Sequence, residues 1–486
     1  MSQDPSPDVT SPAGFRAAMH RVADLVADYL ERVGEYPVVP SISPGEIARA
    51  LPAEPPRRGE PIDRQLEDYQ RLIEPGVTHW NHPGFLAYFS STGSEPGILG
   101  ETLAAGLSVN AMLWRTAPAA TELEERVCDW LRQMIDLPPV FRGHINDTAS
   151  MATLLALAAA RHRQSDLDVR QQGLAGRPEL PRLVAYTSEH AHSSVDKAAI
   201  ALGFGLENLR HLPSDAAFRM DPEALGAAIA ADRRAGHRPI AVVATAGTTS
   251  TTSVDPLRAI AEICRAEKLW LHVDAAWAGN AAICPEYRPL LDGIEEADSV
   301  VVNPHKWLFT PLDCSVMLVR DLDGLRDTFS LVPEYLRTAE QDEALNLMDL
   351  GVQLGRRFRA LKLWMVIRTY GVEGLRERIR EHCRLGREFA GWIEATPGFE
   401  LMAPVPFSTV CFRATRGADE EAIDRFNEEL LARVNRAGPV FLSHTKLHGR
   451  YVLRLSVSNL RTGKEQVDRA WELLRDNAER MAEELG

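Results

Sequence analysis

Residues 269–276 read LWLHVDAA, and residues 299–307 read SVVVNPHKW. Each stretch contains an apolar run that leads to a charged residue, Asp274 in the first and Lys306 in the second. Similar runs are LVAYT at 183–187, IAVVATAG at 240–247 and SVMLVRD at 315–321. Helical stretches alternate with these runs between about residues 140 and 320. Strands that are apolar on both faces and alternate with helices are typical of a mostly parallel sheet covered by helices. We therefore predict an α/β fold.

The polar residues at the ends of these runs mark the predicted site, because ligands of such sheets bind outside the carboxyl ends of the strands. These residues are Ser188, Thr248, Thr249, Asp274, Asn303, His305 and Lys306. A lysine and an aspartate at one sheet edge suit pyridoxal phosphate. The lysine forms a Schiff base with the aldehyde, and the carboxylate holds a proton on the ring nitrogen. A plain buried ion pair is the alternative on Asp274 and Lys306 alone.

Two further segments fit the same cofactor. Thr148, Ala149 and Ser150 precede the strong helix former MATLLALAAAR. A helix N-terminus binds phosphate through its unpaired N–H groups, although Thr or Ser at this place is usually only a cap. His192 follows the LVAYT run. This position suits an imidazole that stacks on a pyridine ring. The alternative is that His192 is an ordinary loop or cap residue.

Composition places the chain among globular proteins. It has 486 residues and 53.8 kDa, with 45% hydrophobic and 25% charged residues, which excludes disorder, collagen and a small disulfide-stapled domain. The net charge is 54 − 68 = −14, and the sequence pI is about 5.5. Nucleic acid binding requires a basic surface, and the sequence contains no dense basic run. We expect no nucleic acid partner.

Cysteine usage and the absence of apolar segments predict the compartment. The six cysteines form no C-x-x-C pair, and no histidine cluster has metal-ligand spacing, so we predict no metal. The first 14 residues carry no basic stretch followed by an apolar core. No segment of about 20 apolar residues occurs. We expect a soluble, cytoplasmic protein without a membrane partner.

The two ends of the chain predict an N-terminal helix and a smaller C-terminal domain. An apolar stripe at steps of three and four predicts an amphipathic helix near the N-terminus. The stripe consists of Phe15, Met19, Val22, Val26, Tyr29 and Val33. A Pro-rich connector follows at 34–60, with a capping-box start at 43–46. The first helix either packs on another subunit or folds back onto its own chain. Beyond about residue 376, helices alternate with TVCFRA, PVFLSH and YVLRLSVS, which indicates a smaller α+β domain.

Five motifs carry a resemblance to a known family. They are HVDAAWAG (272–279), NPHKWLF (303–309), AHSSVDKA (191–198), THWNHPGFLAYF (78–89) and LGRRFRALKLW (354–364). The chain resembles the pyridoxal-phosphate-dependent group II decarboxylases over residues 15 to 475, closest to the aromatic-L-amino-acid decarboxylases. The resemblance implies a homodimer with active sites at the subunit interface, and the aspartate-aminotransferase-like fold of fold type I.

The same resemblance implies three parts of the chain. Residues 1–85 form an N-terminal helical arm that packs on the partner subunit. Residues 86–375 form the large pyridoxal-phosphate-binding domain, with a mostly parallel seven-stranded sheet. Residues 376–486 form the small C-terminal α+β domain.

Site residues follow from the resemblance position by position. Lys306 matches the Schiff-base lysine, Asp274 the partner of the pyridine nitrogen and His192 the ring-stacking histidine. Tyr335, in a polar stretch at about 325 to 350, matches a mobile-loop tyrosine that protonates the carbanionic carbon. The phosphate-end and cofactor-contact positions are Thr148, Ala149, Ser150, Thr249, Ala276, Asn303 and His305, and the substrate-pocket positions are Trp80, Tyr88, Phe89, Ser91 and Met112.

Some of these positions depart from the family pattern. Met112 and Ser91 replace the Phe and Thr of the animal aromatic enzymes, and Asp147 and Thr148 replace a Gly-Ser pair. None of these departures removes a catalytic group, but the first two change residues of the substrate pocket.

The activity implied is decarboxylation of an L-amino acid to an amine and carbon dioxide. Within this family, loss of the loop tyrosine or of the stacking histidine accompanies oxidative deamination to aldehydes, and Tyr335 and His192 are both present. The pocket stretch HWNHPGFLAYFSS (79–91) is aromatic and lacks a cation. It therefore suits phenylalanine, tyrosine, dihydroxyphenylalanine or tryptophan better than glutamate, unless Arg115 supplies a basic partner. The alternatives are an aromatic aldehyde synthase, a decarboxylase of a non-aromatic amino acid, a transaminase, and a cofactor-binding relic without turnover.

Overall fold

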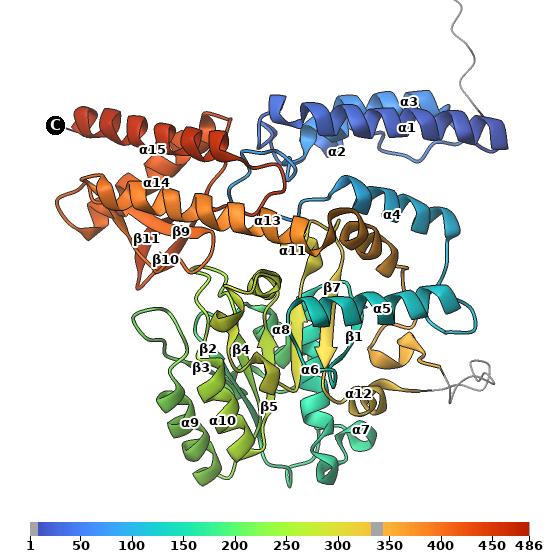
Figure 1. Ribbon diagram of the computed structural model, residues 1–486, viewed down its shortest axis with the longest axis vertical. Coiled ribbons are helices and arrows are strands. Elements are labelled where there is room, and N and C mark those ends of the chain that lie inside the picture. Colours follow the sequence, from blue (N-terminus) through green and yellow to red (C-terminus); the bar gives the residue numbers. More distant parts are fainter. Residues whose placement is uncertain (1–7, 332–343, 486) are drawn as a thin grey trace, which may run out of the picture.

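The computed structural model describes residues 8–331 and 344–485. A seven-stranded sheet forms the centre of the larger part of the chain (Figure 1). Its strands are β1 (Arg142–Asn146), β2 (Leu183–Ser188), β3 (Leu209–Leu212), β4 (Arg238–Thr245), β5 (Trp270–Asp274), β6 (Ser299–Val302) and β7 (Ser315–Val319). Their order is β1-β7-β6-β5-β4-β2-β3. Only β7 runs antiparallel to its neighbours β1 and β6. The predicted mostly parallel α/β sheet is confirmed.

The sheet is buried on both faces because helices cover each side. Consecutive residues of one strand belong to different cores: Val242 packs with α5, α9 and α10, and Val243 packs with α6, α8 and α12. This explains why the strands read as uninterrupted apolar runs. The helices of this part are α5 (Pro118–Met134), α6 (Ala149–His162), α7 (Val169–Gln172), α8 (Ser194–Ala201), α9 (Pro222–Arg234), α10 (Leu257–Glu267), α11 (Pro304–Trp307) and α12 (Leu322–Phe329).

A second, four-stranded antiparallel sheet forms near the C-terminus, in the order β10-β11-β9-β8. Its strands are β8 (Phe399–Leu401), β9 (Thr409–Ala414), β10 (Ser443–Leu447) and β11 (Arg450–Ser456), and its helices are α14 (Glu420–Arg436) and α15 (Lys464–Leu485). The long α13 (Ala360–Ala395) joins it to the larger part and is non-helical at Gly371, where φ is 63°. This helix runs across the domain boundary predicted at residue 375, and the boundaries stay predictions.

The predicted strand PVFLSH is wrong in its first four residues. The strand begins at Ser443, and the preceding Phe441 pairs instead with Phe85 in an isolated parallel bridge. The Phe441 N–H donates to the Gly84 carbonyl, and the Phe441 carbonyl accepts from the Leu86 N–H. This segment therefore joins the end of the N-terminal part to the small sheet. Strands β1 and β3 were not predicted, because RGHIN and LRHL lack a continuous apolar run.

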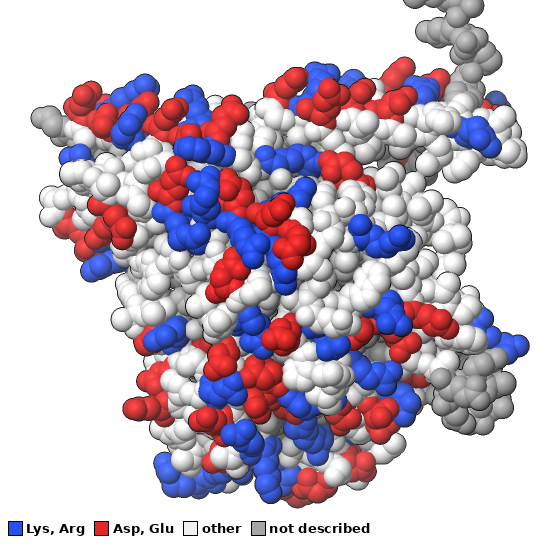
Figure 2. Space-filling model, in the orientation of Figure 1, with Lys and Arg blue, Asp and Glu red and all other residues white. Residues whose placement is uncertain are grey.

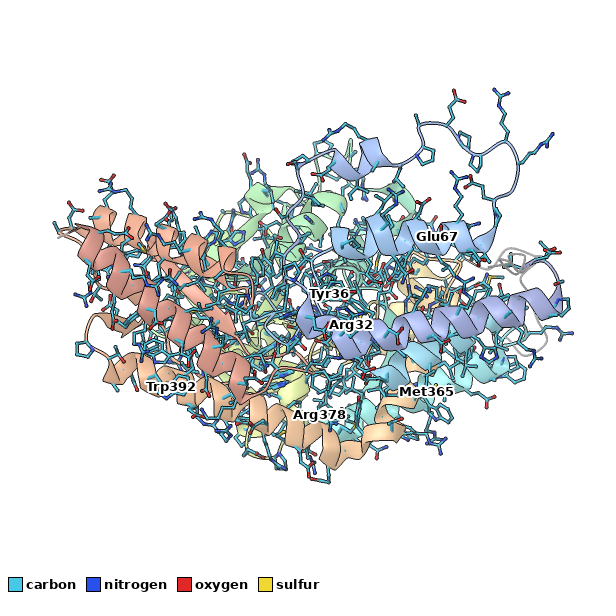
Figure 3. All side chains as sticks on the ribbon, turned by 90° about the horizontal axis from the view of Figure 1, so that it is seen from above. Arg32, Tyr36, Glu67, Met365, Arg378 and Trp392 are labelled. Atoms are coloured by element: carbon cyan, nitrogen blue, oxygen red, sulfur yellow. The ribbon has the colours of Figure 1, made fainter. Side chains whose placement is uncertain are left out.

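The N-terminal part consists of α1 (Pro12–Arg32), α2 (Glu46–Ala50) and α3 (Ile62–Asp68), followed by α4 (Glu95–Leu107). Figure 3 shows α1, with Arg32, beside α3, with Glu67, across the top of the molecule. Tyr29 contacts His79 Nδ1 at 3.1 Å, and Tyr36 donates to Glu74 at 2.5 Å, which holds the end of α1 on its own chain. Phe15 at the other end is 57% exposed. The predicted helix is confirmed, and its packing on a partner stays a prediction.

Charged side chains of both signs are mixed over the face seen in Figure 2, with no extended basic area. The surface over α4 is mostly uncharged. Within residues 8–331 and 344–485, no helix is long and apolar enough to cross a membrane.

Candidate active site

One cavity of about 180 Å³ lies at the carboxyl ends of β4, β5 and β6 and the N-terminus of α6. It brings together all ten residues that the sequence predicts as cofactor-binding: Thr148, Ala149, Ser150, His192, Thr249, Asp274, Ala276, Asn303, His305 and Lys306. It is completed by Phe89, Thr245, Gly247 and Trp277. These segments are far apart in sequence, and the sheet topology alone brings them to one edge.

Lys306 lies in the short helix α11, directly after β6. Burial of its ammonium lowers the pKa, and the neighbouring Asp274 carboxylate opposes that shift. Among the residues that the structure describes, the ammonium has no hydrogen-bond or ion-pair partner and lies 5.2 Å from the centroid of the Phe89 ring. A buried lysine without a carboxylate in direct contact, as far as the structure describes the chain, has the surroundings expected of a reactive amine more than of a structural cation.

Asp274 is the last residue of β5 and is 6% exposed. One oxygen, Oδ1, accepts a hydrogen bond from the Ala276 N–H at 3.1 Å, which fixes the orientation of the carboxylate. Asp274 and Lys306 line the same cavity without the direct contact of a salt bridge within the described residues. The alternative of a plain buried ion pair is therefore wrong.

His192 is held in one orientation and one tautomer by Ser194. The Ser194 N–H donates to His192 Nδ1 at 3.2 Å, and the Ser194 hydroxyl lies 2.9 Å from the same nitrogen. Because a backbone N–H only donates, Nδ1 is the acceptor and the proton of the neutral ring is on Nε2. Burial lowers the pKa of His192, so the ring is neutral at neutral pH. A neutral ring is suited to stacking and to donating one hydrogen bond.

The N-terminus of α6 forms one end of the cavity. Thr148 is the N-cap, and its N–H and hydroxyl both turn toward Asp147 Oδ1, at 2.6 and 3.2 Å. The Thr148 carbonyl accepts from Met151 and Ala152. The hydroxyl predicted to bind a phosphate is therefore engaged, while the helix end still offers its positive dipole to an anion.

His305 and Asn303 are fixed beside this helix end. The Cys314 N–H donates to His305 Nδ1 at 2.9 Å, so the proton of the neutral ring is on Nε2. Burial lowers the pKa of His305 to about 3. The Ser315 hydroxyl donates to the Asn303 side chain at 2.6 Å. Both residues are rigidly held, which suits the binding of a fixed anionic group.

Gly247 shapes the wall between β4 and the segment after β5. Its φ is 91°, and a Cβ there would lie 2.7 Å from the Cβ of Ala278. Any side chain would push these two segments apart. The run IAVVATAG contains this glycine, but the sequence alone does not show what approaches it.

Arg454 is the functional candidate that the sequence reasoning missed. It lies in β11, is 4% exposed, and donates to the Ser250 and Tyr88 carbonyls at 2.9 and 2.8 Å. Its guanidinium carbon is 4.7 Å from the Phe89 ring centroid, and Nη2 is buried without a partner among the described residues. Burial lowers its pKa to about 10, so it keeps its charge at neutral pH. The signal was a cation inside the apolar run YVLRLSVS.

The predicted substrate residues are only partly brought together. Phe89 lines the cavity, whereas Trp80, Tyr88, Ser91 and Met112 do not. Trp80 stacks on Tyr88 with ring centroids 6.0 Å apart, and Tyr88 is 53% exposed. Their role in binding substrate stays a prediction. Tyr335 lies outside the described residues.

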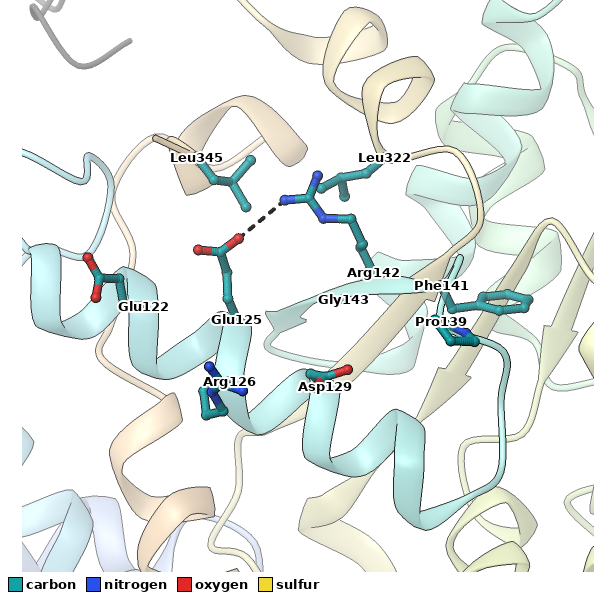
Figure 4. Close-up of a pocket in the computed structure, with 10 residues that line it drawn as sticks. All are labelled: Glu122, Glu125, Arg126, Asp129, Pro139, Phe141, Arg142, Gly143, Leu322 and Leu345. Carbon is teal, nitrogen blue, oxygen red and sulfur yellow. Dashed lines mark hydrogen bonds and ion pairs between the residues drawn. The ribbon is translucent and has the colours of Figure 1, made fainter. Parts of the chain in front are cut away.

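A larger hollow, of about 420 Å³, lies between α5 and β1 (Figure 4). Its polar wall contains Glu125, which pairs with Arg142 at 3.2 Å, and Asp129. None of the predicted site residues lines it. Size alone therefore does not identify the site, and the smaller cavity has the chemistry.

Comparison with known proteins shows the family of this chain. Residues 44–415 match the family described as the pyridoxal-dependent decarboxylase conserved domain. The chain belongs to this family. It is 41% identical to tyrosine decarboxylase 4 of Petroselinum crispum, over 97% of this chain and 95% of that protein. It is also 41% identical to a phenylacetaldehyde synthase of Arabidopsis thaliana, over 94% of each chain.

Solved structures agree with the fold of this pyridoxal-dependent decarboxylase. The crystal structure of Oryza sativa TDC with PLP and tryptamine matches with a TM-score of 0.93 and 38% identity, over 99% of this chain and 100% of that chain. The structure of Catharanthus roseus tryptophan decarboxylase in complex with L-tryptophan matches with a TM-score of 0.90 and 36% identity, over 97% and 99%.

The cavity of this family member fits pyridoxal phosphate. It combines a carboxylate, a helix N-terminus and a lysine that has no polar partner in residues 8–331 and 344–485. The Thr245 hydroxyl lines it and is buried without a partner among the described residues, as expected where a bound group supplies one. Polar side chains that bind a cofactor lack a hydrogen-bond partner in the protein itself.

Proposed function

We propose that this protein decarboxylates an aromatic L-amino acid to the corresponding amine and carbon dioxide, with pyridoxal phosphate as cofactor. The observation that carries the proposal is the single cavity that holds Lys306, Asp274 and His192. Family membership makes the chain a carboxy-lyase. The aromatic substrate class is supported by relatives named for tyrosine and tryptophan decarboxylation.

The residues divide between the two ends of the cofactor. Lys306 would carry it covalently, Asp274 would hold a proton on its ring nitrogen, and His192 would stack on the ring. Thr148, Ala149, Ser150, Asn303 and His305 would hold the phosphate, and Thr249 and Ala276 would contact the ring. When bound, pyridoxal phosphate supplies a ring that accepts the electron pair left at Cα as carbon dioxide departs.

The chain's own groups then bind and protonate the substrate. We assign the carboxylate of the amino acid to Arg454, because its Nη2 is buried and unpaired within the described chain. Phe89 and Trp277 give the cavity an aromatic wall. Tyr335 is assigned the proton transfer to Cα, on the resemblance alone. Because Arg454 is assigned to the carboxylate that every amino acid carries, it does not supply the separate cation that the second carboxylate of glutamate would need.

A panel of the twenty amino acids, with products resolved by mass, tests the reaction and the substrate class together. We expect an aromatic amine and an equal amount of carbon dioxide from one or more aromatic amino acids. Release of peroxide and ammonia in step with substrate loss would instead indicate an aldehyde synthase. A requirement for a keto acid would indicate a transaminase. If no amino acid is turned over, the decarboxylase, the aldehyde synthase and the transaminase are all contradicted.

We also propose that the protein is a homodimer in the cytoplasm. The support for the dimer is a row of leucines on one face of α4. Leu99, Leu103 and Leu107 are 58%, 55% and 60% exposed. Apolar patches of this kind mark interaction surfaces. The support for the cytoplasm is that all six cysteines are unpaired.

Leu103→Glu is expected to make the protein monomeric, because a buried unpaired carboxylate in the middle of the leucine row is strongly unfavourable. Light scattering after size exclusion should give twice the chain mass for the wild type and the chain mass for the variant. Ile200→Glu is the matched control, since Ile200 on α8 is 59% exposed and lies outside the row. A dimeric Leu103→Glu protein would exclude α4 from the interface.

A further inference from the structure

The Phe89 ring lies close to two cations and one aromatic ring, and of the two cations Lys306 lines the cavity whereas Arg454 does not. Lys306 Nζ lies 5.2 Å from its centroid, and the guanidinium carbon of Arg454 lies 4.7 Å from it. Trp277 stacks on Phe89 with centroids 4.6 Å apart and planes 17° apart. The face of an aromatic ring attracts cations, more strongly where water is excluded. Phe89 is therefore more than a wall of the substrate pocket.

A column of stacked rings holds Phe89 in place. Trp277 stacks in turn on Trp307, with centroids 4.0 Å apart and planes 11° apart. The Trp307 indole N–H donates to His382 Nδ1 at 2.8 Å, which anchors the column to α13. Trp307 is also the residue next to Lys306 in the chain. The column thus ties Phe89 to the helix that carries the lysine whose ammonium Phe89 faces.

The two cations need this support because they repel each other in a site with little negative charge. Arg454 lowers the pKa of Lys306, and Asp274 raises it. The other titratable groups that face Lys306 are His192 and His305, and burial keeps both neutral at neutral pH. Asp274 is thus the carboxylate that acts on Lys306, whereas no carboxylate of the described residues pairs with Arg454, and the Phe89 ring attracts both cations.

We propose that Phe89 is a positioning residue: its ring holds the Lys306 ammonium and the Arg454 guanidinium side by side, so that both are directed at the substrate. The proposal depends on the proposed function, in which these two cations bind the cofactor and the substrate carboxylate. It assigns Phe89 a task that an aliphatic side chain of similar size does not perform.

The test is the pH dependence of Lys306 reactivity in the full-length chain prepared without pyridoxal phosphate. Labelling by an amine-reactive reagent, followed by peptide mass spectrometry, gives the pH of half-maximal reactivity. The ring favours the ammonium over the amine, so Phe89→Leu should lower this pH by about one unit, a tenfold change in proton affinity. Phe89→Tyr should keep the wild-type value. Phe141→Leu is the matched control, because Arg320 lies 4.9 Å from that ring, away from the cavity.

A second readout uses the holoenzyme and the amino acid that it decarboxylates. Phe89→Leu should raise KM for that substrate about tenfold, more than it lowers kcat, because Arg454 loses its orientation. Phe89→Tyr should restore KM. Phe89→Met serves in place of the leucine variant if that variant does not fold. An unchanged labelling pH in the folded leucine or methionine variant, or an equal shift in Phe89→Tyr, would overturn the proposal.

The proposed function fails on different evidence. Borohydride reduction of the wild-type holoenzyme should attach the cofactor at Lys306. Attachment of the cofactor at another lysine would refute the role of Lys306 in the reaction. The labelling comparison between the Phe89 variants would still test the contacts of Phe89 with the two cations.

Discussion

Lys306→Met is expected to abolish turnover and to raise the melting temperature of the cofactor-free protein. Methionine keeps the length of the side chain but has no amine to bond to the cofactor. The kcat should fall by at least about 10³-fold, as loss of a covalent nucleophile does in other enzymes. The gain in stability follows because burial of the ammonium is unfavourable, as the lowered pKa of Lys306 shows.

The sign of the pH effect distinguishes this explanation from a packing effect. A lowered pKa means that the folded state carries a penalty, which is fully present below the folded pKa. The penalty is lost as the pH rises through the ordinary lysine pKa of 10.5. The difference in melting temperature between variant and wild type should therefore shrink at alkaline pH, as scanning calorimetry at pH 7 and above pH 10 can show.

Lys362→Met is the matched control. Lys362 is 1% exposed, its pKa is lowered to about 8 by burial, and it pairs with Glu101 at 2.7 Å. Removing it leaves Glu101 with Arg357 and does not touch the cavity. This variant should retain borohydride attachment of the cofactor at Lys306. Turnover in Lys306→Met above one hundredth of the wild-type kcat would contradict the assigned role of Lys306.

The sequence predicted the parts of the fold that depend on a local pattern. The strands β2, β4, β5, β6 and β7 are buried on both faces, so each is a continuous apolar run. Strands β1 and β3 contain histidine and arginine, so they lack a continuous apolar run and were not predicted. The Phe441 segment reads as a strand, but its partner is Phe85, far away in the sequence. Pairing of this kind is set by tertiary packing, which local pattern does not encode.

The site shows the same division. Asp274 was found because it ends a buried strand and Lys306 because it follows shortly after another, where a charge has no packing reason. The sequence does not single out Arg454 within YVLRLSVS, because its place near the Phe89 ring joins two segments that are far apart in the chain. Trp80 and Met112 do not line this cavity, and their roles stay predictions.

Asp274→Asn is expected to lower kcat by about 10²–10³-fold, the loss that follows removal of one preorganised electrostatic partner. The amide has nearly the shape of the carboxylate, and its oxygen can still accept the Ala276 N–H that now bonds Oδ1 at 3.1 Å. The fold of the loop should therefore survive. What the variant loses is the negative charge that would keep the cofactor's ring nitrogen protonated, so the loss should appear in kcat of the decarboxylation.

The same substitution has a second signature that requires no cofactor. Asp274 raises the pKa of Lys306 and of His192, so both values should fall in the variant. For Lys306, the pH of half-maximal labelling should move down, in the same direction as for Phe89→Leu. Combining the two substitutions shows whether their effects add, and additive shifts would mean that the carboxylate and the ring act on the ammonium independently.

Asp298→Asn is the control for this prediction. Asp298 accepts a hydrogen bond from the Leu271 N–H at 2.8 Å near the start of β5, outside the cavity. The Asp298→Asn variant shows whether loss of a carboxylate that hydrogen-bonds to β5 is enough to lower turnover. A kcat for Asp274→Asn within tenfold of the wild type would contradict the assignment. An equal loss in Asp298→Asn would attribute the effect to strand packing, because only Asp274 is placed to act on the cofactor.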